Sequence, residues 1–292
     1  MSEDIPFFSE RSITIVGSGL MGGSLALALK SKCKSLKVLD NDLQTIQLAK
    51  QMKLAETITS DPSEAFEGSG VIILATPVKT IIQFILDLPR LVQNEAIILD
   101  IGSTKGAIVE AMAGLPPRFD PIGGHPMCGK EMLTLSHADP SLFKGAPFAF
   151  VCLERTTPDA TAFAEKLCKV IEAHPVWVDA DNHDRWTAAS SHLPFVVASA
   201  LVEAFPPEAR PLIGPGFTSA TRLAATPSSM MLDIISTNRV NVIESIDRLQ
   251  SNLEKYKELL EQERYVELDN LFSIISNMRE SLLNPQDEEN LK

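Results

Sequence analysis

The stretch SITIVGSGLMGGSLALALKSK, residues 12–32, decides the fold. It starts with a short apolar run rich in β-branched residues, passes through a glycine-rich turn and ends in a segment compatible with a helix. Gly17, Gly19 and Gly22 match the pattern G-x-G-x-x-G. There the first glycine allows a tight turn, the second lets the backbone approach a pyrophosphate, and the third permits close helix packing. The stretch predicts a dinucleotide-binding unit, and a glycine turn without a ligand is the alternative.

The alternation of strand and helix continues to Asp179. The predicted strands are apolar without a polar alternation, which is typical of a parallel sheet covered by helices on both faces. They fall at residues 35–42, 70–78, 95–103, 146–153 and 174–180, with helices at residues 43–52, 80–92 and 104–115. This order predicts an α/β fold with an N-terminal, Rossmann-type doubly wound sheet over residues 1–179.

No further convincing strand follows Asp179, and helical segments dominate residues 180–292. Core packing within one chain would explain the apolar stripe that runs along the last long segment, and so would burial against a second subunit. We favour the second explanation and expect an all-α substrate and dimerisation domain over residues 180–292, with a homodimer formed through its C-terminal helices. The stripe has steps of three and four and consists of Val240, Ile243, Ile246, Leu249, Leu253, Tyr256 and Leu260.

The composition excludes several classes of partner. A formal net charge of -12 does not suit a nucleic-acid partner, because phosphate binding needs clustered Lys and Arg. The four cysteines form no CxxC or Cys/His ligand pattern, so we expect reduced thiols and no metal site. The first residues lack a signal pattern, and the apolar runs fall far short of the ~20 residues that a membrane helix needs. We therefore expect a soluble, cytoplasmic protein without a membrane partner.

Asp40 ends the second predicted strand, eighteen positions after Gly22. A carboxylate there accepts a hydrogen bond from the ribose 2′-hydroxyl of NAD and repels the 2′-phosphate of NADP. No Arg or Lys follows at once, so NAD is the expected cofactor. Asp40 alternatively starts a turn, with Asp42 capping the next helix. Further residues expected at the cofactor are Leu20 and Met21 in the glycine turn and Thr76 and Pro77 after the third strand.

Ser103 and His125 lie where a bound substrate is expected. Ligands of open α/β sheets bind beyond the carboxyl ends of the strands, and Ser103 follows the fourth predicted strand. Capping the next helix is its alternative role. His125 stands in PIGGHPMCGKE, residues 121–131, where Gly-Gly and Pro suit neither a helix nor a strand interior. We therefore expect His125 on a loop at the carboxyl edge of the sheet, where loops carry function.

Five motifs give the chain a resemblance to a known family. They are GSGLMGGSLA, DIGSTKG, GGHPMCGKE, SSHLPFVVASAL and GFTSATRLA, in this order. The chain thereby resembles the prephenate and arogenate dehydrogenases of tyrosine biosynthesis, from about Ser12 to Leu283. Many dehydrogenases share the glycine pattern, whereas GGHPM followed by SHLP and the GF segment with its TR is specific to this family.

The resemblance implies roles for five residues. His125 would hydrogen-bond the ring hydroxyl of the substrate and accept its proton during hydride transfer, and Ser103 would contact the same hydroxyl. Arg222 would hold a substrate carboxylate. His192 would line the pocket, and Glu131 would belong to a polar network at its mouth.

The residues themselves leave other roles open for some of these positions. His192 precedes an apolar helical run and also suits a packing role, and Arg222 also suits a surface ion pair. A single histidine is usually a surface or satisfied residue, and His137, His174 and His183 are interpreted in that way.

The resemblance implies an NAD-dependent prephenate dehydrogenase that also releases carbon dioxide. A neutral imidazole has a pKa suited to accepting a hydroxyl proton, and a planar guanidinium suits a carboxylate. Arogenate or 4-amino-4-deoxyprephenate is the alternative substrate, and a catalytically silent NAD-binding interaction module is the alternative function. Thr218, Ser219 and Met230 or Met231 depart from residues common in the family, which leaves the choice of substrate open. We expect neither chorismate mutase helices before the first strand nor a regulatory ACT domain after Leu283.

Overall fold

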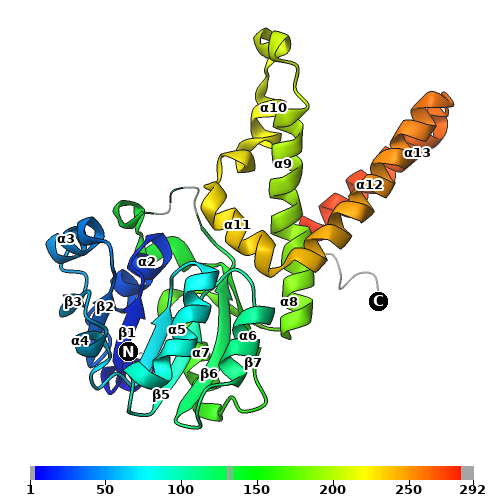
Figure 1. Cartoon of the computed structure of the whole chain (residues 1–292). Coiled ribbons are helices and arrows are strands. Elements are labelled where there is room, and N and C mark those ends of the chain that lie inside the picture. The colour runs from blue at the N-terminus through cyan, green and yellow to red at the C-terminus, as the bar shows by residue number, and fades with distance from the viewer. Residues whose placement is uncertain (1–3, 130–131, 133, 284–292) are drawn as a thin grey trace. The chain divides into compact units, whose positions relative to one another are not determined.

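Eight strands form one sheet in the computed structural model, within the described residues 4–129, 132 and 134–283. Their order is β3-β2-β1-β4-β5-β6-β7-β8 (Figure 1). Neighbouring strands are parallel except β6 and β7, which are antiparallel. The strands are β1 (Ser12–Val16), β2 (Ser35–Leu39), β3 (Thr57–Thr59), β4 (Val71–Leu74), β5 (Ala96–Asp100), β6 (Phe119–Pro126), β7 (Pro147–Cys152) and β8 (His174–Trp177).

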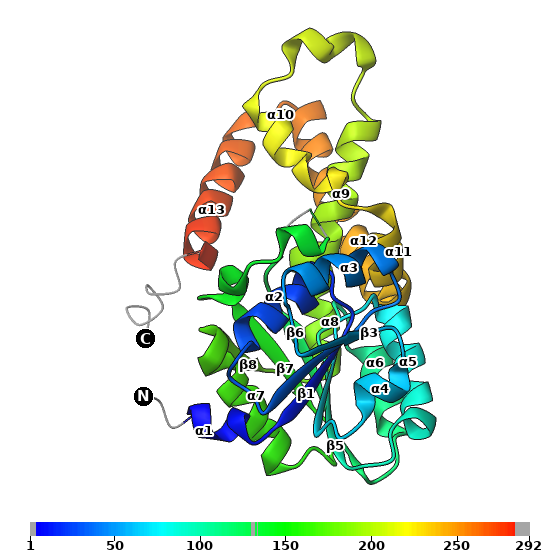
Figure 2. The ribbon, with the colours of Figure 1, turned by 90° about the vertical axis from the view of Figure 1, so that its left-hand side faces the viewer.

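Helices cover both faces of the sheet (Figure 2), which confirms the doubly wound α/β fold. Successive strand residues point to opposite faces, so Ile13 and Ile15 of β1 enter one core while Ile72 and Leu74 of β4 enter the other. The first core lies under α1 (Asp4–Ser9), α2 (Leu20–Leu29), α3 (Leu43–Gln51) and α7 (Pro158–Ile171). The second lies under α4 (Pro62–Phe66), α5 (Val78–Leu91) and α6 (Gly106–Ala113).

β3 and β8 are the edges of this sheet. β3 has only three residues and was not predicted, whereas β8 confirms the last predicted strand. The amides of His174 and Val178 donate to the carbonyls of Ala146 and Phe150 at 2.9 and 3.0 Å, so this side of β8 faces β7.

His125 lies in a strand, so the prediction of a loop is wrong. It belongs to β6 and pairs with Ala149 of the antiparallel strand β7. The glycines that suggested a loop are needed for close packing instead. A Cβ on Gly124 would lie 2.7 Å from the carbonyl oxygen of Asp100, closer than real Cβ contacts come. Pro126 is the last residue of β6, where a missing amide does not interrupt the strand.

Helices make up the described chain from residue 180 onward, as predicted. α8 (Ala180–Thr187) passes through the π-helical turn η3 (Ala188–His192) into α9 (Leu193–Glu203). The wide turn has a local cause, because Pro194 has no amide to pair with the Ser190 carbonyl and its ring would clash with that group in an α-helix. The later elements are η4 (Pro207–Leu212), α10 (Pro215–Ala220), η5 (Arg222–Ala225), α11 (Ser228–Thr237), α12 (Arg239–Glu261) and α13 (Tyr265–Leu283).

The chain divides into two compact units, Met1–Val242 and Ile243–Lys292, and the division falls inside α12. In the second unit, the rings of Tyr256 on α12 and Phe272 on α13 stack with their centroids 5.9 Å apart. A domain boundary at residues 179 and 180 remains a prediction. None of the described helices combines the length and the hydropathy that crossing a membrane requires.

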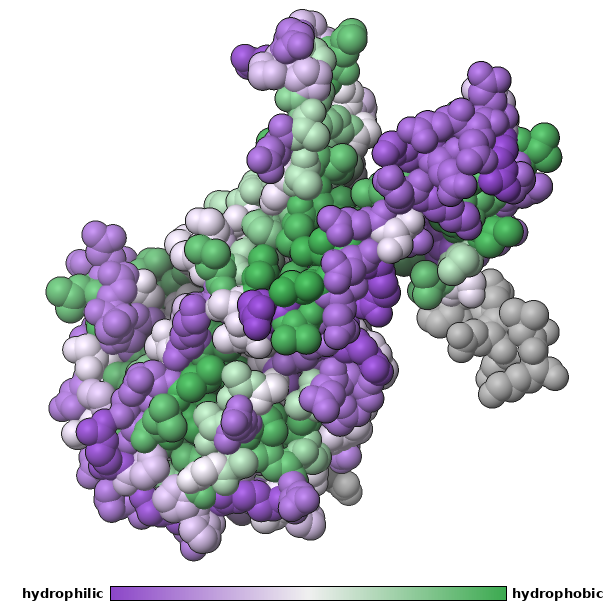
Figure 3. Space-filling model, turned by 45° about the vertical axis from the view of Figure 1, so that its right-hand side comes forward, coloured by the Kyte–Doolittle hydropathy of each residue, from purple (hydrophilic) through white to green (hydrophobic). Residues whose placement is uncertain are grey.

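Large apolar side chains remain exposed on the later helices of the single chain. Figure 3 shows apolar residues gathered over α9, where Leu201 and Val202 are 42% and 48% exposed. Much of the predicted stripe is also exposed, between 44% and 60%, at Val240, Ile243, Leu253 and Leu260. A monomer would leave this apolar surface in water.

Candidate active site

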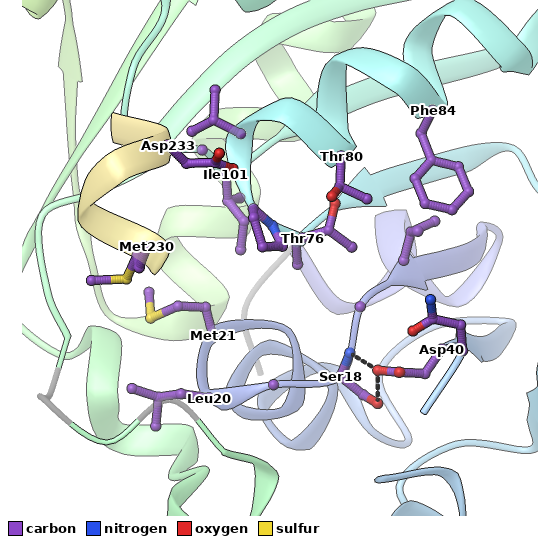
Figure 4. Close-up of a pocket in the computed structure, with 18 of the residues that line it drawn as sticks. Ser18, Leu20, Met21, Asp40, Thr76, Thr80, Phe84, Ile101, Met230 and Asp233 are labelled. Carbon is purple, nitrogen blue, oxygen red and sulfur yellow. Dashed lines mark hydrogen bonds between the residues drawn. The ribbon is translucent and has the colours of Figure 1, made fainter. Parts of the chain in front are cut away.

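A pocket of about 730 Å³ opens at the carboxyl ends of β1, β2, β4 and β5, within the first compact unit. Val16 of β1 lines it, together with Ala75 after β4 and Ile101 after β5. The strand order reverses between β1 and β4, and doubly wound sheets bind ligands at such a point. Helix α11 adds Met230 and Asp233 from the other side (Figure 4).

The glycine-rich turn forms a cradle at the start of α2. Gly17 has φ of +91°, a conformation that side-chain-bearing residues rarely adopt, and a Cβ there would lie 2.7 Å from Thr76. A Cβ on Gly22 would lie 1.9 Å from the Gly17 carbonyl oxygen. Gly19 precedes α2 and supplies no side-chain cap. The first amides of the helix are therefore suited to an anion such as a pyrophosphate.

The residues predicted for the cofactor meet at this pocket. Gly22 lies behind the turn, against Gly17. Within the described chain, Thr76 Oγ1 is a buried side-chain oxygen without a hydrogen-bond partner, so a bound molecule would supply one. The orphaned hydroxyl and the glycine cradle fit a dinucleotide. The predicted residues that line the pocket are Gly17, Gly19, Leu20, Met21, Asp40, Thr76 and Pro77.

Asp40 lies at the rim of the pocket, just after β2. Its Oδ2 accepts hydrogen bonds from the amide and the hydroxyl of Ser18, both at 2.7 Å (Figure 4). Its Oδ1 accepts from the amide of Asp42 at 3.0 Å. Asp42 in turn caps α3 by accepting from the amide of Thr45, as the sequence indicated. These donors hold the Asp40 carboxylate beside the glycine turn.

Ser103 lines the pocket, and it is not the cap of the following helix. Helix α6 begins three residues later, and its first amides are bound by a residue far away in the sequence. Asp184 of α8 accepts from the amide of Lys105 at 2.7 Å and from that of Gly106 at 2.8 Å. The Ser103 hydroxyl is therefore not needed to cap α6.

His125 is half-buried near the end of β6, and its Nδ1 lies 2.9 Å from Nε2 of His183. Burial places the pKa of His125 well below its usual value, and the nearby His183, Lys105 and His192 add to this effect. The imidazole is therefore neutral at neutral pH, as a proton acceptor must be.

His183 and Asp184 are site residues that sequence reasoning missed. His183, interpreted above as an ordinary histidine, is 3% exposed and contacts Asp184 Oδ1 through Nδ1 at 2.8 Å. Burial opposes the charge of Asp184, but hydrogen bonds from His183 and from the amides of Gly106 and Lys105 lower the pKa of its carboxyl. The sequence offered one signal, a histidine beside an aspartate at the start of the first helix after the sheet, but not its partner on β6.

A buried ion pair fixes the backbone that carries His125. Lys105 and Asp100 are both fully buried and in contact through Nζ and Oδ2. Lys105 Nζ also donates to the Gly124 carbonyl at 2.7 Å, and Asp100 accepts from the Gly124 amide at 3.2 Å. Burial raises the pKa of Asp100 and lowers that of Lys105, and their mutual attraction opposes both changes. The ends of β5 and β6 are thus tied together.

His192 is buried at the end of the π-helical turn. Its Nδ1 lies 3.3 Å from the side-chain nitrogen Nδ2 of Asn238. The same nitrogen donates to the backbone carbonyl of Asp184 at 2.6 Å. Burial lowers the pKa of His192 to about 4. His192 therefore joins the network around Asp184 as a neutral ring. It is not among the described residues that line the cofactor pocket.

Arg222 and Glu131 complete the predicted site residues. Arg222 begins the turn η5, is exposed and is not among the described residues that line the pocket. Glu131 lies outside the described residues. Of the predicted substrate and catalytic residues, the network around Asp184 joins His125 and His192, and Ser103 lines the cofactor pocket.

Comparison with known proteins gives matches over most of the chain. Residues 25–177 match the family model for the nucleotide-binding domain of prephenate dehydrogenase. Residues 179–274 match the model for the dimerization domain of prephenate dehydrogenase. A prephenate dehydrogenase of Bacillus subtilis is 29% identical over 93% of this chain and 76% of its own length.

Solved structures agree with this assignment. Prephenate dehydrogenase from A. aeolicus, in complex with hydroxyphenyl propionate and NAD+, has a TM-score of 0.86 and 26% identity and covers 94% of this chain and 99% of its own. Synechocystis arogenate dehydrogenase has a TM-score of 0.81 and 25% identity and covers 93% of this chain and 99% of its own. These two structures are thus named for a prephenate and an arogenate dehydrogenase.

Proposed function

This chain belongs to the prephenate dehydrogenase family, and we propose that it catalyses the NAD-dependent oxidative decarboxylation of prephenate to 4-hydroxyphenylpyruvate. The observation that carries the proposal is the neutral imidazole of His125, held through Nδ1 at the carboxyl edge of the sheet. Ser103 follows β5, the strand beside β6, so it lies at the same edge of the sheet as His125. A secondary alcohol can be oxidised only if its proton is removed, and this edge offers a base for that proton.

In the proposed reaction, His125 takes the hydroxyl proton of the substrate and later returns it to the same oxygen. When bound, NAD would accept the hydride that leaves ring C4 with its electron pair. His125 takes the proton of the C4 hydroxyl as the C4–oxygen bond becomes a carbonyl, and Ser103 orients the same oxygen. The bond between C1 and its carboxylate then breaks, carbon dioxide leaves, and the electron pair passes through the ring to the oxygen at C4. That oxygen recovers the proton from His125, which leaves an aromatic ring bearing a hydroxyl.

The binding groups follow from the chemistry of the substrate. Prephenate is a dicarboxylate, and Arg222 provides a planar guanidinium suited to one carboxylate. His192 is proposed to line the substrate site. The glycine turn would hold the pyrophosphate of the cofactor, and Asp40 would accept a hydrogen bond from its ribose 2′-hydroxyl, which favours NAD over NADP.

The assay that tests the proposal follows NADH absorbance with prephenate and arogenate side by side, and repeats the preferred reaction with NADP. We expect higher kcat/KM with prephenate and with NAD. A preference for arogenate would support the alternative substrate. Activity with neither would overturn the proposal and favour a silent NAD-binding module, and a preference for NADP would overturn the role of Asp40.

The enzyme is proposed to work as a homodimer in the cytoplasm. The match to a dimerization domain and the exposed apolar stripe at Val240, Ile243, Leu253 and Leu260 support the dimer. The four cysteines are unpaired, as expected in a reducing compartment. Light scattering after size-exclusion chromatography should give twice the chain mass of 31.8 kDa, and a mass of one chain would overturn the dimer.

A further inference from the structure

We propose that Asp184 sets opposite ring tautomers in His125 and His192, so that Nε2 is a proton acceptor in the first and a hydrogen-bond donor in the second. His183 and Asn238 carry this effect and act as positioning residues. The functional part of the inference rests on the proposed reaction, whereas the tautomers themselves do not.

The Asp184 carboxylate can only accept hydrogen bonds. Its Oδ1 accepts from the amide of Lys105 at 2.7 Å and lies 2.8 Å from Nδ1 of His183. Its Oδ2 accepts from the amide of Gly106 at 2.8 Å. The bonded nitrogen of His183 must therefore carry the ring proton.

This proton decides the tautomer of the next ring. In a neutral His183 with its ring proton on Nδ1, Nε2 is an acceptor. Nδ1 of His125 lies 2.9 Å away and must donate. His125 then has no proton on Nε2, and no described residue hydrogen-bonds that nitrogen. The proton acceptor of the proposed reaction is therefore Nε2 of His125, and the negative charge of Asp184 stabilises the imidazolium that forms.

The backbone carbonyl of Asp184 determines the tautomer of His192 through the side chain of Asn238. Its carbonyl can only accept, so the group of Asn238 that contacts it at 2.6 Å is the amide NH2. The side chain of Asn241 donates to the other end, Oδ1 of Asn238, at 2.8 Å, which agrees with this orientation. The NH2 group also faces Nδ1 of His192 at 3.3 Å. Nδ1 of His192 is therefore the acceptor, and its proton lies on Nε2.

The two rings then offer complementary chemistry. Nε2 of His125 takes a proton, whereas Nε2–H of His192 is a hydrogen-bond donor. Both rings are neutral because burial lowers their pKa values. A single aspartate at the start of the helical part thus organises a base and a donor without charging either ring.

The tautomers are tested on the full-length protein with nitrogen-15-labelled histidine. Long-range proton–nitrogen NMR spectra at pH 7.5 distinguish a protonated from an unprotonated ring nitrogen, and single His→Gln variants assign the five histidines. We expect protons on Nδ1 of His125, Nδ1 of His183 and Nε2 of His192. A proton on Nε2 of His125 or of His183, or on Nδ1 of His192, would overturn the proposal, whether or not the protein is active.

The positioning role is tested by kinetics. His183→Leu removes the acceptor for His125, and we expect kcat to fall about 100-fold while KM changes by less than about threefold. His183→Gln keeps a carbonyl that can accept from Nδ1 of His125 and should recover at least tenfold of that loss. His174→Leu, at an exposed histidine on β8, is the matched control and should leave kcat unchanged. Equal kcat values for the Gln and Leu variants would overturn the positioning role, whereas a wild-type enzyme inactive on both substrates would overturn only the proposed reaction.

Discussion

At the scale of single residues, contacts and burial restrict the orientation and the protonation of the side chains that form the site. His125 cannot rotate freely, because its Nδ1 is engaged by His183, and its ring stays neutral at neutral pH, because burial lowers its pKa. Asp40 is similarly held by Ser18. Such restraints leave one nitrogen and one carboxylate in fixed places before any ligand arrives.

The proton-acceptor role predicts a selective loss of turnover in His125→Asn. Asparagine has no basic nitrogen, so kcat should fall about 10²–10⁴-fold, while the dissociation constant for NAD, measured by fluorescence titration, should stay within about threefold. Unchanged turnover would contradict the role, and lost NAD binding would indicate damage to the fold.

The carboxylate-binding role predicts a different pattern in Arg222→Ala. Removing a charge-assisted hydrogen bond should raise the KM for prephenate about tenfold or more with a smaller change in kcat. Arg210→Ala, at another exposed arginine, serves as the control and should leave KM unchanged. A normal KM in Arg222→Ala would show that another group holds the carboxylate.

At the scale of elements, local sequence patterns correctly predicted the structural features that depend only on adjacent residues. The glycine turn, the apolar strands and the cap at Asp42 follow from a few adjacent residues and were correct. The strand at His125 was missed because its glycines serve a long-range contact with Asp100 that local propensity cannot show. His183 was missed for the same reason, because its partner lies 58 positions away.

The close passage of β6 over β5 predicts that Gly124→Ala is destabilising. A Cβ there would meet backbone at 2.7 Å and the side chains of Leu99 and Phe148 at 2.9 and 3.0 Å, so the free energy of unfolding should fall by about 1–3 kcal/mol. Urea denaturation measures this change. Gly216→Ala, where a Cβ would meet nothing within 4 Å, is the control, and equal stability of the two variants would refute the packing argument.

At the scale of the whole molecule, buried neutral histidines make stability depend on pH. The pKa of His192 is about 4 in the folded protein, below the ~6.5 of an unfolded chain. Between these values the unfolded state binds more protons, so the free energy of unfolding falls as the pH falls. From pH 7 to pH 5, His192 alone should remove about 2 kcal/mol.

Urea denaturation at both pH values and one protein concentration tests this prediction. His192→Gln has no titrating ring and should lose about 2 kcal/mol less than the wild type over the same interval. An identical loss in both proteins would show that His192 takes up its proton without opposing the fold.

The sequence of the edge strand β8 determines which backbone amides the edge of the sheet offers to another strand. His174 and Val178 direct their amides toward β7, so the alternate residues Pro175 and Trp177 face outward. Proline has no amide, and it stands at an outward position where β7 does not need one. Trp177 is then the one residue of this short strand with an outward amide, so an incoming strand would find a broken row of donors. The order of residues in β8 thus disfavours extension of the sheet by an added strand.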